Sequence, residues 1–138
     1  MTAETALRQL ADRTAIRDVI LRYARGVDRR DWALVASCFA TDAFADYDDV
    51  VKGTATEMIA VIAPALARFA NTMHVMGNQL IELAGDTAES ETYAVCYHRL
   101  GENRVMVVGL RYLDRLQRDR ERWLIQRRVV KFEWLQRP

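Results

Sequence analysis

The first part of the chain carries apolar residues at steps of three and four. Between Glu4 and Val27 they fall at Leu7, Leu10, Ala11, Ile16, Val19, Ile20, Tyr23 and Val27. An α-helix turns once every 3.6 residues, so this spacing gathers the apolar side chains on one face. The pattern predicts one long amphipathic helix.

Shorter elements follow this helix. Asp31 precedes the run Trp32–Phe39 and suits the N-cap of a second, short helix. The segment Ala43–Tyr47 is predicted to form a short strand. Thr54 and Glu57 have the spacing of a capping box, which predicts the start of a third helix, and Pro64 is expected to end or kink it.

The rest of the chain has a different texture. Four segments rich in Val, Ile, Tyr and Trp follow, namely Thr72–Leu83, Thr87–Leu100, Arg104–Leu116 and Trp123–Leu135, and turn residues separate them. Helices followed by strands predict an α+β fold, with three N-terminal helices on one face of a curved, mostly antiparallel sheet. Such a sheet forms a cone-shaped α+β barrel with an apolar interior. No repeat or linker interrupts residues 1–138, which predicts a single domain.

Composition narrows the class of protein. The 138 residues are 51% hydrophobic and 28% charged, with a net charge of +1. This balance is that of a globular protein and argues against nucleic acid or a membrane surface as a partner. No segment resembles a signal peptide or a membrane span, so the expected location is cytoplasmic. Cys38 and Cys96 sit in apolar segments and are expected to be buried thiols.

Asp28 is the first candidate for chemistry. It falls at the end of the predicted first helix, where the helix dipole disfavours a negative side chain by up to about 1 kcal/mol. Asp31 already caps the next helix, so Asp28 has no evident local role, although exposure to solvent is the competing interpretation. Tyr23 lies about 140° from Asp28 around an ideal helix and also fits an aromatic core position.

His74 is the second candidate. As one of two histidines, it shares a predicted strand face with Thr72, Met76, Asn78 and Leu80, and a hydrogen-bonded core histidine is the competing interpretation. His98 shares a face with Ala94 and Cys96. The sequence has no metal-ligand cluster, phosphate-binding loop or nucleophile elbow, so no metal or cofactor is expected.

The residues around these candidates carry a resemblance. The stretch Ala15–Trp32, followed by Phe39-x-x-Asp42, Ala45-Asp46-Tyr47, Thr72-Met-His-x-x-x-Asn78 and Trp123-x-Ile, resembles the SnoaL-like branch of the nuclear transport factor 2-like superfamily. The combination of Tyr-x4-Asp with Thr-x-His is similar to the pattern of scytalone dehydratase, bile-acid dehydratase and hexachlorocyclohexane dehydrochlorinase. The resemblance covers nearly the whole chain.

The resemblance implies roles for particular residues. It pairs Asp28 with His74, makes His74 the base, and places Tyr23 and Tyr47 at the site. Residues expected to bind substrate or shape its pocket are His98, Arg128, Asn78, Phe44, Met76 and Phe132. A carboxylate on one ring nitrogen of histidine raises its pKa and fixes the tautomer, which leaves the other nitrogen as a base near neutral pH.

The resulting hypothesis is a cofactor-independent lyase or isomerase that removes a proton from a small, largely apolar carbonyl or hydroxyl compound. One alternative is an enzyme like polyketide cyclase or ketosteroid isomerase, in which Asp28 itself is the base. Another is a non-catalytic binding or assembly module like the small subunits of ring-hydroxylating dioxygenases. The fold alone does not separate these functions.

Apolar residues also occupy both faces of one predicted strand. Val105, Val107 and Leu113 alternate with Met106, Val108 and Leu110. Helices cover only one face of the sheet, so the pattern predicts a homodimer or homotrimer formed through the other face.

Overall fold

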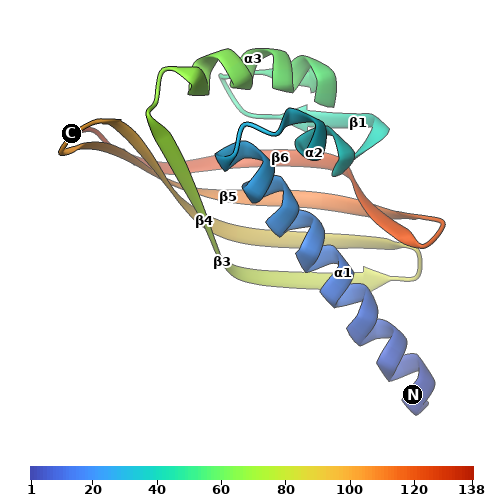
Figure 1. Cartoon of the computed structure of the whole chain (residues 1–138). Coiled ribbons are helices and arrows are strands. Elements are labelled where there is room, and N and C mark those ends of the chain that lie inside the picture. Colours follow the sequence, from blue (N-terminus) through green and yellow to red (C-terminus); the bar gives the residue numbers. More distant parts are fainter.

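A computed structural model describes all residues, 1–138, and contains three helices and six strands (Figure 1). The elements are α1 (Ala3–Asp28), α2 (Trp32–Ser37), β1 (Phe39–Asp46), β2 (Lys52–Thr54), α3 (Ala55–Ala67), β3 (Asn71–Ala84), β4 (Thr87–Gly101), β5 (Arg104–Asp119) and β6 (Arg122–Gln136). The strands form one sheet in the order β2-β1-β6-β5-β4-β3. Its neighbouring strands are antiparallel except for β1 and β6, which are parallel.

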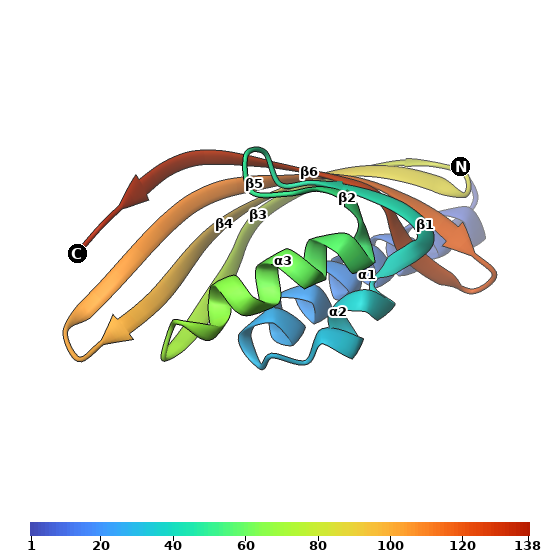
Figure 2. The same ribbon diagram turned by 90° about the horizontal axis from the view of Figure 1, so that it is seen from above.

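The predicted α+β class and the arrangement of its layers are confirmed. All three helices lie on the concave face of the curved sheet, which arches over them (Figure 2). The sheet remains open, because β2 and β3 are its two edges and do not pair with each other. The barrel of the prediction is therefore an open cone.

Local signals determine where the helices begin. The side chain of Asp31 accepts a hydrogen bond from the Leu34 N–H and caps α2 as predicted. The capping box of Thr54 and Glu57 is present at the start of α3. Pro64 does not end α3, which continues to Ala67. Burial of Leu66 in the last turn offsets the backbone hydrogen bond that proline cannot make.

Two boundaries differ from the sequence prediction. The second helix ends at Ser37, and Phe39 already begins β1, so the strand is longer than Ala43–Tyr47. The short strand β2 was not predicted. It pairs with the end of β1, through Phe44–Thr54, Ala45–Gly53 and Asp46–Lys52, and its three residues are too few to show a period.

Helix α1 buries only part of its apolar stripe. Ile16, Ile20 and Val27 are core residues, but Leu7 and Leu10 are 69% and 63% exposed, contrary to the continuous stripe that the sequence suggests. The first turns of α1 project beyond the sheet (Figure 1), so no layer lies beneath them. No helix combines the length and apolar character needed to cross a lipid bilayer.

Asp12 attaches the middle of α1 to the sheet. Its carboxylate accepts hydrogen bonds from the Arg118 guanidinium at 2.8 Å and from the Trp123 indole N–H at 3.1 Å. Arg118 also lies over the Trp123 ring, 4.7 Å from its centroid. These contacts, from both strands of the β5–β6 hairpin, fix the course of α1 toward its C-terminal end.

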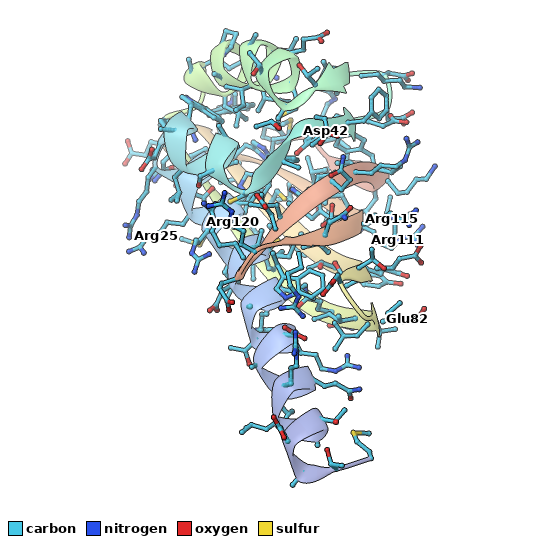
Figure 3. The ribbon with its side chains drawn as sticks, turned by 90° about the vertical axis from the view of Figure 1, so that its right-hand side faces the viewer. Arg25, Asp42, Glu82, Arg111, Arg115 and Arg120 are labelled. Atoms are coloured by element: carbon cyan, nitrogen blue, oxygen red, sulfur yellow. The ribbon has the colours of Figure 1, made fainter.

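The convex face of the sheet carries no helix. Tyr93, Tyr97 and Trp134 are each between 42% and 49% exposed there. Ion pairs flank them, since Arg111 binds both Glu91 and Glu133, and Arg111 and Arg115 point away from the helices (Figure 3). An apolar surface of this kind is typical of a protein–protein contact.

We propose that this face joins copies of the chain in a homodimer or homotrimer. The substitution Tyr97→Glu should convert the oligomer to monomer, because a buried unpaired carboxylate is costly in an apolar interface. Sedimentation velocity at micromolar concentration measures the change. Arg25→Glu, on the helical side (Figure 3), is the control and should leave the oligomer intact. A wild-type chain that sediments as a monomer would refute the proposal.

Candidate active site

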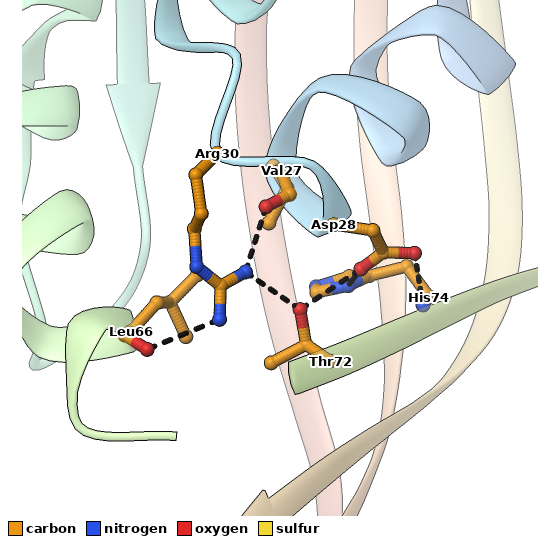
Figure 4. A network of polar contacts seen from close by, with 6 residues as sticks. All are labelled: Val27, Asp28, Arg30, Leu66, Thr72 and His74. Carbon is orange, nitrogen blue, oxygen red and sulfur yellow. Dashed lines mark hydrogen bonds and ion pairs between the residues drawn. The ribbon is translucent and has the colours of Figure 1, made fainter. Parts of the chain in front are cut away.

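The C-terminal end of α1 meets the start of β3 through Asp28 and His74. The His74 Nδ1 atom lies 2.7 Å from Asp28 Oδ1, although 46 positions separate the two residues (Figure 4). An ionised carboxylate only accepts hydrogen bonds, so Nδ1 carries the proton in this contact. The neutral ring therefore has its free lone pair on Nε2.

Two further donors hold the Asp28 carboxylate. The His74 backbone N–H donates to Oδ2 at 2.8 Å, and the Thr72 hydroxyl donates to Oδ1 at 3.0 Å. Burial favours the neutral acid, but the hydrogen bonds from His74 and Thr72 outweigh it and lower the pKa of Asp28. Asp28 is therefore an ionised carboxylate that accepts three hydrogen bonds, all from residues of β3.

The same contact sets the protonation of His74. Burial disfavours the imidazolium, but the hydrogen bond to Asp28, supported by Cys96 on the adjacent strand, prevails and raises the pKa of His74 to about 9. The sequence suggested a base near neutral pH. The structure instead gives a ring that is mostly protonated at pH 7.

His74 borders a small cavity between the helices and the concave face of the sheet. The cavity has a volume of about 100 Å³. Its lining is mostly apolar and consists of Tyr23, Val27, Tyr47, Ile62, Leu66, His74, Cys96, His98, Val108, Leu110, Tyr112, Val130 and Phe132. Asp28 is not part of the lining, so the carboxylate reaches the cavity only through the His74 ring.

Tyr23 and Tyr47 lie together at the cavity. Their hydroxyl oxygens are 2.7 Å apart, and both side chains are buried. Burial, followed by the neighbouring Tyr47, raises the pKa of Tyr23 well above its usual value, and burial likewise raises the pKa of Tyr47. Both phenols are therefore neutral, and one hydroxyl donates its hydrogen bond to the other. Tyr23 and Asp28 lie about 140° apart on an ideal helix, but Tyr23 lines the cavity directly and Asp28 reaches it through His74.

Arg128 lies beneath the tyrosines rather than at the cavity wall. Its guanidinium donates to Asp114 through Nε at 2.7 Å and Nη2 at 2.8 Å, and both side chains are fully buried. The guanidinium carbon lies 4.2 Å from the ring centroid of Tyr23 and 4.2 Å from that of Tyr112, and the two rings are in edge contact with each other. Nη1 has no hydrogen-bond partner. The structure thus gives Arg128 contacts with tyrosines instead of direct access to a ligand.

His98 stands beside His74 on the cavity wall. The two ring centroids are 6.0 Å apart, and His98 Nδ1 has no partner although the residue is only 7% exposed. Burial, and then the charge on His74, lower the pKa of His98. His98 is therefore neutral when His74 is protonated, which gives the cavity one charged and one uncharged imidazole.

Of the remaining predicted pocket residues, one lines the cavity and the others do not. Phe132 lines the cavity at its exposed end. Met76 packs against the core but does not line the cavity, and Phe44 is 38% exposed beneath the Arg127 guanidinium. Asn78 is on the convex face, because the register between β3 and β4 shifts between Met76 and Gln79. This bulge reverses the alternation of side chains, so Asn78 and Leu80 leave the face of His74.

Sequence reasoning missed three contributors, namely Cys96 as a neighbour of His74, Tyr112 and Asp114. Asp114 had one available signal, since its position on β5 shares the inward face with Leu110, Tyr112 and Leu116. A carboxylate at an inward position requires a buried cation. No three His, Cys, Asp or Glu side chains are arranged to hold a metal ion together.

Comparison with solved structures shows the same fold in several proteins. The chain is similar to hexachlorocyclohexane dehydrochlorinase LinA-type3 from Novosphingobium barchaimii, with 20% identity, a TM-score of 0.86, and 96% and 94% of the two chains covered. It is also similar to a candidate scytalone dehydratase from Novosphingobium aromaticivorans, with 18% identity, a TM-score of 0.85, and 94% and 89% covered. At these identities the likeness establishes the fold alone.

A relative in sequence and a family model complete the comparison. An uncharacterised protein of Mycobacterium tuberculosis is 26% identical over 130 residues, which cover 90% of this chain and 87% of the relative. The model of the SnoaL-like domain matches residues 8–129, a span that includes every residue lining the cavity except Phe132 and Val130. The match confirms the resemblance seen in the sequence, and the chain belongs to the SnoaL-like domain family.

Proposed function

We propose that the protein is a cofactor-independent lyase or isomerase that removes a proton from a carbon atom of a small, largely apolar substrate. One observation carries the proposal: Asp28 holds Nδ1 of His74 at 2.7 Å, while the ring borders an apolar cavity. This arrangement of base and orienting carboxylate is the one that general base catalysis requires.

His74 is the base in this proposal. Nε2 takes a proton from a carbon next to a carbonyl, and the electron pair of the C–H bond moves toward the carbonyl oxygen. In an elimination, that pair then forms the C=C bond as a hydroxyl group on the next carbon leaves. The leaving oxygen takes up the proton that Nε2 of His74 removed and departs as water, which returns the ring to its starting form. Asp28 stabilises the imidazolium formed in the first step.

The Tyr23–Tyr47 pair supplies a hydrogen bond to the oxygen that gains charge, because one hydroxyl donates to the other and the accepting hydroxyl keeps its own hydrogen free. Both phenols are neutral and buried, and hydrogen bonds in such surroundings are stronger than in solution. Arg128 lies 4.2 Å from the ring of Tyr23 and favours negative charge on the phenols. We therefore assign it a role that acts through the tyrosines.

The cavity restricts the substrate class. A volume of about 100 Å³ is well below the roughly 300–1,000 Å³ of typical ligand pockets, so only the reacting part of a substrate fits without widening of the cavity. Phe132 at the exposed end would contact the remainder. The named neighbours, a dehydrochlorinase and a candidate scytalone dehydratase, accord with proton removal followed by loss of a leaving group.

Direct proton abstraction by Asp28 fits the geometry less well. The carboxylate already accepts three hydrogen bonds, and it does not line the cavity. Its lowered pKa also makes it a weak base. These contacts favour the His74 mechanism over the one in which Asp28 is the base.

The roles of the pair are tested by exchange of deuterium into small apolar β-hydroxyketones in D₂O, followed by mass spectrometry. Above about pH 9, where His74 is neutral in the wild type and in Asp28→Asn, His74→Gln should lower the rate by about a hundredfold or more, because it removes the base, and Asp28→Asn should lower it by about tenfold or more, because the ring loses its orienting partner. Asp31→Asn is the matched control and should retain full activity, because asparagine also caps a helix.

Retention of activity in His74→Gln together with its loss in Asp28→Asn would contradict this mechanism and favour Asp28 as the base. Circular dichroism of each variant confirms that the fold is intact.

The pH dependence follows from the direction of the pKa shift. Because the neutral form of His74 is the active one and its pKa is about 9, kcat/KM should rise about tenfold per pH unit from pH 7 and level off above about pH 9. In Asp28→Asn the plateau should begin at a lower pH, near the ordinary histidine value of about 6.5. A profile that is flat between pH 7 and 9 would exclude His74 as the base.

A further inference from the structure

Arg30 joins three segments beside the Asp28–His74 pair. Its Nη1 atom donates to the Val27 carbonyl and to the Thr72 hydroxyl, both at 2.8 Å, and Nη2 donates to the Leu66 carbonyl at 3.1 Å (Figure 4). The side chain thus links the end of α1, the end of α3 and the start of β3. Arg30 has a φ of 56°, which a residue with a Cβ adopts at a cost of roughly 1 kcal/mol.

The contact with Thr72 has only one possible direction. A guanidinium donates hydrogen bonds and accepts none, so the Thr72 oxygen is the acceptor toward Arg30. The hydroxyl has a single hydrogen, which is then available for Asp28 Oδ1 at 3.0 Å. Arg30 therefore decides which way the Thr72 hydroxyl points.

This direction matters for the carboxylate. Oδ1 accepts from both the Thr72 hydroxyl and His74 Nδ1, and Oδ2 accepts from the His74 backbone. If the hydroxyl hydrogen turned away, an oxygen lone pair would face Oδ1 at 3.0 Å, and the two would repel. The carboxylate would then rotate and loosen its bond to the imidazole.

We propose that Arg30 is a positioning residue of the site, which acts through the Thr72 hydroxyl to hold Asp28 against His74. An effect of Arg30 on catalysis rests on the proposed function, but its effect on the Asp28–His74 hydrogen bond can be measured in the ligand-free protein. Arg30 also anchors the carbonyl of Leu66, whose side chain lines the cavity. One guanidinium thus sets both the orientation of the base and the position of the cavity wall.

A purely structural role is the competing interpretation. In that case Arg30 would fasten α3 to β3, and its loss would reduce stability without a specific effect on His74. The two interpretations differ in whether the effect of Arg30 requires the hydroxyl of Thr72. A double-mutant cycle between the two residues separates them.

The test measures exchange with water of the His74 Nδ1 proton, by NMR of ¹⁵N-labelled protein at pH 6, where the ring is protonated. His74→Gln assigns the signal, since the chain has two histidines. Arg30→Met should speed exchange by about fivefold or more, because the hydrogen bond from His74 Nδ1 to Asp28 opens more often. Thr72→Val should do the same, whereas Thr72→Ser should exchange like the wild type.

Arg29→Met is the matched control for charge, because Arg29 is an exposed arginine in the same turn, and it should leave exchange unchanged. In the Thr72→Val background, Arg30→Met should add little. Unchanged exchange in Arg30→Met would overturn the proposal, and so would an equal acceleration in both backgrounds. Thermal unfolding of every variant verifies that the protein is folded, and Arg30→Lys, which keeps the charge, provides a milder change if Arg30→Met does not fold.

The result is independent of turnover. If Asp28→Asn and His74→Gln retain deuterium exchange activity, the proposed function fails whatever the NMR shows. If those variants are inactive and Arg30→Met leaves the Nδ1 proton unaffected, only the role of Arg30 fails.

Discussion

The hydrogen bond between Asp28 and His74 is the interaction on which the site depends. It joins the last residue of α1 to the third residue after the start of β3, so it requires both the course of α1 over the sheet and the register of β3. The helix dipole opposes a carboxylate at this end of α1 by up to about 1 kcal/mol. The donors from Thr72 and His74 supply more than that, since hydrogen bonds to a charged group contribute about 1.5–3 kcal/mol each.

A second buried ion pair complements the first. The buried charges of Arg128 and Asp114 compensate each other, and the Arg128 guanidinium contacts the rings of both Tyr23 and Tyr112. A buried guanidinium without its carboxylate would destabilise the fold by about 3–5 kcal/mol. The apolar cavity is lined by His74 of the first pair and by Tyr23 and Tyr112, which contact Arg128 of the second. The proposed proton removal at His74 and the charge development near the tyrosines would therefore occur in one small cavity.

The sequence predicted the features that depend on local pattern. The amphipathic α1, the caps at Asp31 and Thr54, and the four long strands all follow from side-chain period or backbone hydrogen-bonding signals. The family resemblance brought Asp28, His74, Tyr23 and Tyr47 together, which periodicity could not do across 46 positions. The prediction of Asn78 at the pocket was wrong because no residue other than Gly77 indicates the bulge after Met76 in the sequence. Arg128 was assigned to the ligand because its partner Asp114 comes from another strand, and pairing across strands is absent from a linear pattern.

The most direct test of this account is an NMR titration of the His74 ring in the ligand-free protein, with His74→Gln to assign the signal. We expect a pKa of about 9 for His74. In Asp28→Asn the pKa should fall markedly, because an amide cannot stabilise the imidazolium as a carboxylate does. A wild-type pKa near the ordinary value of about 6.5, unchanged in Asp28→Asn, would show that the two side chains do not form the pair, and would contradict the account.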